Sequence, residues 1–352
     1  MSQHFTGPRG RGASDNPPGR FERLEVVSDE PLPGRVATQF LRDDSRSIVA
    51  HNQSPDVPFE VSINPYRGCE HGCTYCYART YHEYLGFSAG LDFETRILVK
   101  EKAPELLRAE LDSPRWRPQV LGISGVTDPY QPAERRLELT RRCLEVLDEY
   151  RNPVALITKN ALVTRDLDHL TELARCSAAG IAISITSLDP ELTRRMEPRT
   201  SHPRDRLEAL ETLSKHGIPC GVSVAPVVPG LTDHEIPEIL QAAADHGASW
   251  ANWLLLRLPG AVEGIFRNWL QQTYRDRANK VLNRIRSLRG GELSDSQFGR
   301  RMRGEGVFAD QIRSLFLNAA ERQGLASTSP RLSSDAFRRP GGHQLDLLSE
   351  DR

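Results

Sequence analysis

The sequence predicts an α/β fold of parallel strands followed by a helical extension. From residue 59 to residue 256, short β-branched runs alternate with amphipathic helical patterns. This order is typical of parallel strands joined by right-handed crossover helices. After residue 258 only helical patterns remain. We therefore expect four segments: a disordered tail over 1–55, an α/β core over 56–258, a basic helical extension over 259–324 and a flexible tail over 325–352.

The opening of the chain carries no folding pattern. Residues 1–55 are rich in Pro, Gly, Arg, Asp and Ser, which predicts a solvated tail, although a basic opening such as 7–12 can also contact nucleic acid. Residues 1–12 contain no apolar segment that would mark a signal peptide, and the longest apolar run, 253–256, is too short to cross a bilayer. From these two observations we expect a cytoplasmic protein whose clustered thiols bind metal rather than form disulfides. The formal net charge of −1 does not by itself require a nucleic-acid or membrane partner.

The core is expected to contain six strands and five helices. Short runs of β-branched and other apolar residues bounded by turn residues predict the strands, at 59–63, 120–124, 154–158, 181–186, 219–225 and 250–256. A further extended run covers 95–99. Amphipathic periodicity predicts the helices, at 104–111, 133–150, 162–176, 204–216 and 232–246. The extension is expected to add three helices, at 262–277, 278–288 and 308–322.

Three of the six cysteines lie within eight residues, in the spacing C-x3-C-x2-C: Cys69, Cys73 and Cys76. Neighbouring thiols in so short a loop bridge poorly and an odd count leaves one over, which argues against disulfides. A closed zinc site needs four ligands, and Fe–S cubanes are usually held by four thiolates. Three cysteines without an obvious fourth therefore favour a cubane with one open iron. The other cysteines lie in helix or strand patterns and are expected to be buried small side chains: Cys143, Cys176 and Cys220.

This motif, with Tyr75 directly before its last cysteine, resembles the signature of the radical S-adenosylmethionine (SAM) superfamily. The flanking segments 64–69 and 75–79 are similar to the branch related to spore photoproduct lyase, the DNA repair photolyase-like branch. The resemblance implies a partial (β/α)6 TIM-like barrel whose site lies at the carboxyl ends of the strands. It also implies a [4Fe–4S] cluster held by the three cysteines, with SAM on the fourth iron. Reductive cleavage of SAM would then yield a 5′-deoxyadenosyl radical that abstracts hydrogen from the substrate.

The resemblance further implies SAM contacts where the strands end. Thr127 and Asp128 occupy the place of acceptors for the SAM amino group, and the alternative for them is a plain Asp-Pro turn. Lys159 offers a cation for the SAM carboxylate, or is a solvated lysine. Ser184 and Ser187 could bond the ribose hydroxyls.

Two further segments complete the implied SAM site. Arg199 resembles a carboxylate-binding position suited to a bidentate guanidinium. The segment 224–230 resembles the strand that receives adenine, or is a strand end followed by a Pro-Gly turn. In spore photoproduct lyase a hydrogen-donating cysteine stands where this sequence has Val126, which has no labile hydrogen. We therefore do not expect true spore photoproduct lyase activity.

The expected substrate is a nucleic acid, such as a DNA lesion or a modified base. From residue 257 to residue 322 there are 13 Lys and Arg against 7 Asp and Glu, and such a surplus favours a polyanion. The tail segment Gln344–Leu348 resembles the peptide by which bacterial proteins dock on the DNA polymerase sliding clamp, or is a chance match. An electron donor such as flavodoxin or ferredoxin is implied. The alternatives are radical SAM modification of RNA, a peptide or a small metabolite, and a non-catalytic Fe–S protein.

Overall fold

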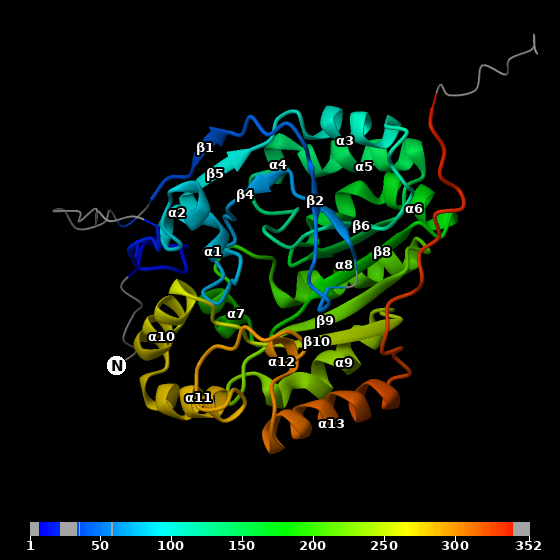
Figure 1. Cartoon of the computed structure of the whole chain (residues 1–352). Coiled ribbons are helices and arrows are strands. Elements are labelled where there is room, and N and C mark those ends of the chain that lie inside the picture. Colours follow the sequence, from blue (N-terminus) through cyan, green and yellow to red (C-terminus); the bar gives the residue numbers. More distant parts are fainter. Residues whose placement is uncertain (1–6, 22–33, 35, 58, 341–352) are drawn as a thin grey trace, which may run out of the picture.

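A seven-stranded sheet forms the centre of the molecule in the computed structural model, which describes residues 7–21, 34, 36–57 and 59–340 (Figure 1). The strand order is β10-β9-β8-β7-β6-β3-β2. All neighbouring pairs are parallel except β2 and β3. The six parallel strands confirm the predicted set, and they run Val61–Ile63 (β3), Leu121–Ile123 (β6), Val154–Thr158 (β7), Ala179–Ser184 (β8), Cys220–Val227 (β9) and Trp250–Leu255 (β10).

A second, three-stranded sheet lies beside the first, in the order β1-β5-β4. Its members are β1 (Gln39–Arg42), β4 (Tyr66–Arg67) and β5 (Arg96–Val99). β5 is the extended run predicted over 95–99, and it pairs with β1 in parallel and with β4 in antiparallel register. Because β4 leads directly into the cysteines, this sheet positions the start of the cysteine loop, residues 68–78.

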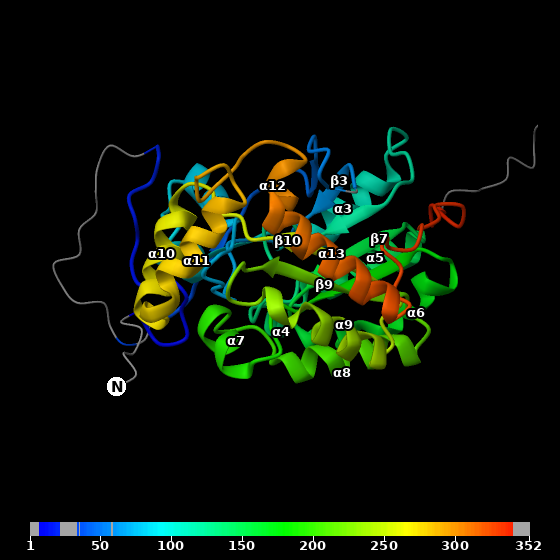
Figure 2. The ribbon, with the colours of Figure 1, turned by 90° about the horizontal axis from the view of Figure 1, so that it is seen from below.

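Helices cover the outside of the seven-stranded sheet (Figure 2). The crossover helices are α3 (Ala103–Asp112), α5 (Leu139–Tyr150), α6 (Leu167–Arg175), α8 (Pro203–Lys215) and α9 (Ile236–Asp245). Shorter elements not predicted from the sequence are α1 (Arg79–His82), η1 (Glu83–Leu85), α2 (Leu91–Thr95) and α7 (Pro190–Met196). The short helices α4 (Glu134–Leu137), η2 (Ala161–Asp166) and η3 (Asp233–Glu235) form the first parts of three predicted helices. The crossover helices thus return the chain to the same end of the sheet before each parallel strand begins. The carboxyl ends of these strands therefore lie together at one edge of the sheet.

The predicted helix over 133–150 is broken in two, into α4 and α5. Glu138 lies between them in the left-handed region, with φ 51°. The Glu134 carboxylate accepts hydrogen bonds from the backbone N–H groups of Thr140 (3.0 Å) and Arg141 (3.2 Å). A buried side chain therefore caps the start of α5, which periodicity alone does not reveal.

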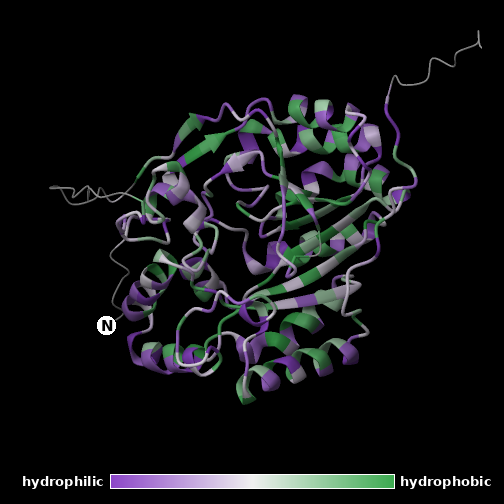
Figure 3. Cartoon of the chain, in the orientation of Figure 1, coloured by the Kyte–Doolittle hydropathy of each residue, from purple (hydrophilic) through white to green (hydrophobic). Residues whose placement is uncertain are grey.

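The core lies between the sheet and its helices. All six residues of β8 are buried, and their neighbours Leu156 and Val222 are also inaccessible. Figure 3 shows hydrophobic residues along the strands and hydrophilic ones on the outer helices. Cys143 and Cys220 belong to this core, as predicted, whereas Cys176 is only half-buried and packs against it.

The segments expected to be tails contribute structure. Within 1–55 the chain forms β1 and β2 (Val49–His51), and β2 pairs with β3. At the other end, residues 325–340 lie along the sheet and its helices. The N–H of Ala326 donates to the Ser249 carbonyl (3.1 Å), and the Ser333 N–H donates to the Ser177 carbonyl (2.9 Å). Both segments are polar, and backbone hydrogen bonds rather than apolar periodicity hold them. Gln344–Leu348 lies outside the described residues.

The helical extension packs on both the barrel and the cysteine loop. It comprises α10 (Ala261–Thr273), α11 (Arg275–Ser287), α12 (Arg300–Arg303) and α13 (Val307–Arg322). The first two helices therefore divide at Tyr274, three residues earlier than predicted. α13 packs on α9, whereas α10 and α11 share an apolar cluster with Cys73 and Tyr75. In the part of the chain that the structure describes, no helix is long and apolar enough to cross a membrane.

Candidate functional site

The cysteine loop, residues 68–78, connects β4 to α1. Gly68 and Gly72 adopt φ of +82° and +67°, a region that glycine enters without steric cost. A Cβ on Gly72 would stand 2.7 Å from Oε2 of Glu94, so the turn between Cys69 and Cys73 requires glycine for space as well. The loop is also tied to both flanks, since Cys69 N–H donates to Phe93 O (2.9 Å) and Thr74 N–H donates to Met196 O (3.0 Å).

A buried ion pair supports the loop from below. The Arg79 guanidinium donates to the Cys73 carbonyl through Nε (3.0 Å) and Nη2 (2.9 Å) and bonds the Glu94 carboxylate at 2.5 Å. Both side chains have no exposed surface. A buried pair costs desolvation free energy unless its remaining donors and acceptors are satisfied. Here Nη1 of Arg79 also donates to the carbonyls of Ala89 and Gly90, and backbone N–H groups donate to the Glu94 carboxylate. The pair therefore holds the loop in one conformation.

The three thiols are free and close to one another. Cys69 and Cys73 are buried and Cys76 is half-buried. Burial raises the pKa of Cys76 to about 11, and the nearby Cys69 adds to the rise. Burial, followed by the nearby Glu197 carboxylate, also raises the pKa of Cys73. Metal binding would therefore release protons from these thiols.

This donor set fits a cubane. Among the described residues no three Cys, His, Asp or Glu side chains could hold a single metal ion. A cubane does not need such a group, because its thiolates bind different iron atoms. Three thiols in one braced loop supply three such ligands and leave one iron without a protein thiolate.

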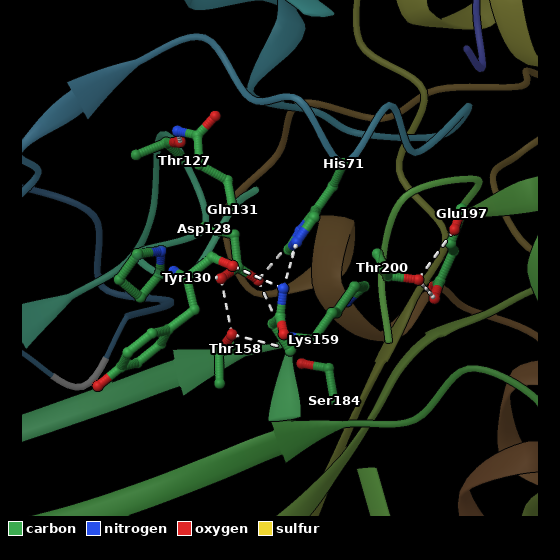
Figure 4. Close-up of polar contacts among 12 residues, drawn as sticks. His71, Thr127, Asp128, Tyr130, Gln131, Thr158, Lys159, Ser184, Glu197 and Thr200 are labelled. Carbon is green, nitrogen blue, oxygen red and sulfur yellow. Dashed lines mark hydrogen bonds and ion pairs between the residues drawn. The ribbon is translucent and has the colours of Figure 1, made fainter. Parts of the chain in front are cut away.

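Asp128 joins the loop to the strand ends (Figure 4). It follows β6, and its Oδ1 accepts hydrogen bonds from Thr158 Oγ1 (2.6 Å) and Tyr130 N–H (2.9 Å). Its Oδ2 accepts from Lys159 N–H (2.8 Å) and lies 3.5 Å from Nδ1 of His71. These donors fill the carboxylate's acceptor positions. Asp128 therefore connects the middle of the cysteine loop to the ends of β6 and β7.

Charge reinforces this connection. Burial disfavours both charged side chains, but each offsets the cost for the other. The Asp128 carboxylate raises the pKa of His71 to about 10 despite burial. The pKa of Asp128 is lowered to about 2, because the attraction of His71 and the bonds from Thr158 and Lys159 outweigh its desolvation.

Thr127 contacts the loop as well. Its hydroxyl donates to the Gly68 carbonyl (2.8 Å) and accepts from Nε2 of Gln131 (2.9 Å). The Gln131 side-chain oxygen in turn accepts from the Glu70 N–H (2.9 Å). The predicted acceptor pair, Thr127 and Asp128, is thus engaged by the protein itself and braces the cysteine loop.

A second buried carboxylate, Glu197, receives Tyr75. The Tyr75 hydroxyl donates to Glu197, as does Thr186 Oγ1 (2.6 Å). The fully buried Arg206 guanidinium forms an ion pair with the other carboxylate oxygen. Burial opposes ionisation of Glu197, but Arg206 and then Lys159 lower its pKa to about 2. Tyr75, between two cysteines, is thereby fixed by a charged pair.

The remaining predicted SAM contacts differ in whether the protein already binds their polar groups. Lys159 Nζ donates to the Ala225 carbonyl (3.1 Å) and lies 5.9 Å from the centre of the Tyr75 ring, so a cation does stand beside the loop. Ser184 is buried at the end of β8. Ser187 Oγ instead donates to the Glu235 carboxylate (2.8 Å). Their roles toward SAM stay predictions.

Arg199 lies next to the loop but is already paired. Its Nη1 bonds Glu70 Oε1 at 2.9 Å, and its side chain is 31% exposed. Glu70 also accepts from Thr38 Oγ1 (2.6 Å). The guanidinium thus approaches the loop from the side of α7, with part of its donor set open to solvent.

Sequence reasoning missed three side chains of this site: Glu70, His71 and Glu197. The first two lie between the cysteines, where their position in the motif was an available signal. Glu197 lies two residues before Arg199, and its place beside that arginine was the only local signal. Its partner Arg206 lies on the inner face of α8, and no pattern within the sequence pairs the two.

Comparisons with known proteins agree with this geometry. The radical SAM superfamily profile matches residues 63–243. An uncharacterized protein of Mycobacterium tuberculosis is 37% identical over 234 residues, which is 66% of this chain and 68% of that protein. An uncharacterized protein of Methanocaldococcus jannaschii is 27% identical over 222 residues, covering 63% of this chain and 79% of that one.

Solved structures share the fold. Spore photoproduct lyase complexed with dinucleoside spore photoproduct is similar with a TM-score of 0.59 at 16% identity, over 82% of this chain and 81% of that chain. A mutant of the lyase with bound AdoMet and dinucleoside spore photoproduct has a TM-score of 0.55 at 17% identity, over 82% of this chain and 80% of that one. At these identities the likeness shows a common architecture.

Proposed function

Because the chain belongs to the radical SAM superfamily and is an enzyme that uses a [4Fe–4S] cluster and SAM, we propose that it acts on nucleic acid in a DNA-repair-like reaction. The cofactors, when bound, supply a 5′-deoxyadenosyl radical by reductive cleavage of SAM. Cys69, Cys73 and Cys76 would hold the cluster. An electron donor such as flavodoxin or ferredoxin would reduce it.

The chain's own polar residues position the cofactors. Asp128 and His71 hold the cysteine loop against the strand ends, and Glu197 orients Tyr75. Lys159 places a cation beside that ring, where the SAM carboxylate is expected. Such preorganised contacts cost no rearrangement when SAM arrives.

The observation that carries the nucleic-acid proposal is the fold shared with spore photoproduct lyase. That protein is complexed with a dinucleoside spore photoproduct, and the likeness covers 82% of this chain. The basic extension supports the same substrate class, because Lys and Arg side chains neutralise phosphates. α10 and α11 pack against the cysteine loop, so a polyanion bound to them would lie close to the cluster.

The extension's arginines divide into two groups. Arg300 pairs with Asp295 and Glu305, and Arg301 pairs with Asp56 beyond β2. These pairs, and the bond from Arg303 to the Trp253 carbonyl, make α12 a poor choice for testing DNA contact by charge reversal. In α10 and α11, by contrast, several basic side chains are exposed and form no ion pair within the described residues: Arg267, Arg275, Arg277 and Lys280.

The first experiment asks whether damaged DNA stimulates the chemistry. The reconstituted, reduced enzyme is given SAM with or without ultraviolet-irradiated duplex DNA, and 5′-deoxyadenosine is quantified. We expect formation to rise with irradiated DNA and to be unchanged by intact duplex. Formation indifferent to both would keep the enzyme class and remove the DNA substrate, leaving RNA, a peptide or a metabolite.

The contact surface is tested by binding at several salt concentrations. Arg275→Glu with Arg277→Glu should reduce the slope of log affinity against log salt by about 0.9 for each lost phosphate contact. The control reverses Arg115 and Arg117, which are also exposed but precede β6 at the opposite ends of the strands. Equal slopes in the two variants would remove α11 as the DNA contact.

The second proposed partner is the sliding clamp, through Gln344–Leu348. A peptide spanning residues 341–352 should bind the clamp, since a glutamine and leucines suit a polar contact beside an apolar groove. Absence of binding at high micromolar peptide would exclude this partner.

A further inference from the structure

An N-terminal strap, residues 7–21, lies against the outer side of the cysteine loop, between α2 and α10 (Figure 1). We propose that this strap is a wall of the cluster site that holds the loop and protects the cluster from dioxygen. The inference depends on the family's cluster and not on the proposed nucleic-acid substrate.

The strap binds the carboxylate that supports the loop. The N–H groups of Gly12 and Ala13 donate to the two oxygens of Glu94, at 3.0 and 2.8 Å. Glu94 is the buried partner of Arg79, which donates to the Cys73 carbonyl. The strap backbone therefore supplies two of the hydrogen bonds that make this buried charge tolerable. Without the strap, water would reach Glu94.

Close backbone contacts show that the strap is fitted to the loop. A Cβ on Gly12 would stand 1.8 Å from the Gly72 carbonyl oxygen and 3.1 Å from Thr74 Cγ2. On the α2 side, a Cβ on Gly90 would stand 2.0 Å from the Asp15 carbonyl oxygen. Gly12 thus allows the strap to lie against the residues that flank Cys73, and Gly90 allows it to lie against the start of α2.

Arg11 fastens the middle of the strap. It is 6% exposed, and it donates to the Glu94 carbonyl (2.7 Å), the Val36 carbonyl (2.8 Å) and Thr38 Oγ1 (3.0 Å). Thr38 Oγ1 donates in turn to Glu70 (2.6 Å), between two of the cysteines. A long cationic side chain is rarely this buried unless its donors are satisfied, and all these acceptors belong to the surroundings of the loop.

Two further contacts anchor the strap to the helices around it. Ala13 packs with Leu91 and Ile265 of α10 in one apolar cluster. Further along, Arg20 forms an ion pair with Glu83 at 2.8 Å. The strap therefore spans from the helical extension to η1, across the side of the loop that faces away from the barrel.

The test displaces the strap from either side without touching a cysteine. Gly12→Ala and Gly90→Ala each introduce a methyl group where backbone oxygen already stands, so the strap must move away. Gly264→Ala is the matched control, because Gly264 lies in α10 with no atom within 4 Å of its added Cβ. The holoenzymes are prepared without oxygen, and iron and sulfide are counted. Decay of the cluster absorbance in air and trypsin cleavage at Arg20 are then followed.

We expect both strap variants to be cleaved faster at Arg20 and to lose the cluster several-fold faster in air, while Gly264→Ala behaves like the wild type. Faster cleavage with an unchanged decay in air would overturn the protective role. Unchanged cleavage would contradict the contact itself.

A deletion of residues 1–21 separates the strap from α2. The cluster of the shortened chain should decay in air as fast as the clusters of the two glycine variants. Adding Gly90→Ala to it should have no further effect, because the clashing Asp15 carbonyl is gone. A further acceleration there would show that the Gly90→Ala substitution acts through α2 and would count against the strap.

Discussion

Two buried carboxylates beside the cysteine loop, Asp128 and Glu197, are kept ionised by different partners. The pKa of each is lowered to about 2 although burial opposes ionisation. The charge of His71 is the largest factor that keeps Asp128 ionised, followed by bonds from hydroxyl and N–H donors, and its side chain keeps 12% exposure. Glu197 and its partner Arg206 have no exposed side-chain surface.

The difference lies in how each charge is compensated. Each carboxylate accepts several hydrogen bonds and faces one cation at short range. The imidazole of His71 can lose its charge, whereas the guanidinium of Arg206 is always charged, and a buried carboxylate that loses its partner is strongly destabilising. Asp128 thus links the loop to the strands through a partner that titrates, whereas Tyr75 is fixed through a permanently charged and fully buried pair.

The largest effect should follow from removing the cation beside Glu197. Arg206→Met keeps the apolar stem but removes the buried partner charge of Glu197, which should lower the free energy of unfolding by about 3–5 kcal/mol. Denaturant unfolding of the apoprotein measures it. Arg204→Met breaks an exposed pair with Glu208 and should cost at most about 0.5 kcal/mol. Similar losses in the two variants would show that the buried Arg206–Glu197 pair is worth no more than an exposed one.

An intermediate effect is expected at Asp128, and it depends on pH. Its pKa in the folded chain, about 2, lies below the ordinary value of 3.8, so the stabilisation is complete above about pH 4 and is lost as pH falls toward 2. The shift corresponds to about 2 kcal/mol. Asp128→Asn should therefore be less stable at pH 6 and lose less stability between pH 4 and 2. If the free energy of unfolding of the wild type and of Asp128→Asn changed in parallel with pH, the neighbours of Asp128 would not lower its pKa.

The smallest effects distinguish two serines near the strand ends. Ser187→Ala removes the hydroxyl that bonds Glu235 and should cost about 1 kcal/mol of stability. Ser184→Ala removes a hydroxyl that makes no hydrogen bond within the described residues, and should cost less than about 0.5 kcal/mol. If Ser184 binds the SAM ribose, its variant should instead weaken SAM affinity in a binding titration. Unchanged SAM affinity in the Ser184 variant would remove it from the site.

Periodicity and spacing predicted the framework of this protein well. Short apolar runs bounded by turns predicted the six parallel strands. The spacing of Cys69, Cys73 and Cys76 predicted a metal-binding loop. These signals are local, since a strand or a metal-binding loop is encoded within about ten residues. Local signals also explain the errors. The strap has a polar, Gly-rich sequence without periodicity, and β1 is only four residues long. Both are held by partners far along the chain.

The sequence by itself therefore determined the cysteine motif, the α/β core and, through resemblance, the superfamily. Tertiary structure decided what surrounds the cysteines: Glu94 accepts from Gly12 and Ala13 some 80 residues away, and Tyr75 donates to Glu197 across 122 residues. It also decided that Asp128 braces the loop. The physical reason is that a buried charge needs partners in space, and the fold brings them together from segments whose own patterns give no sign of the contact.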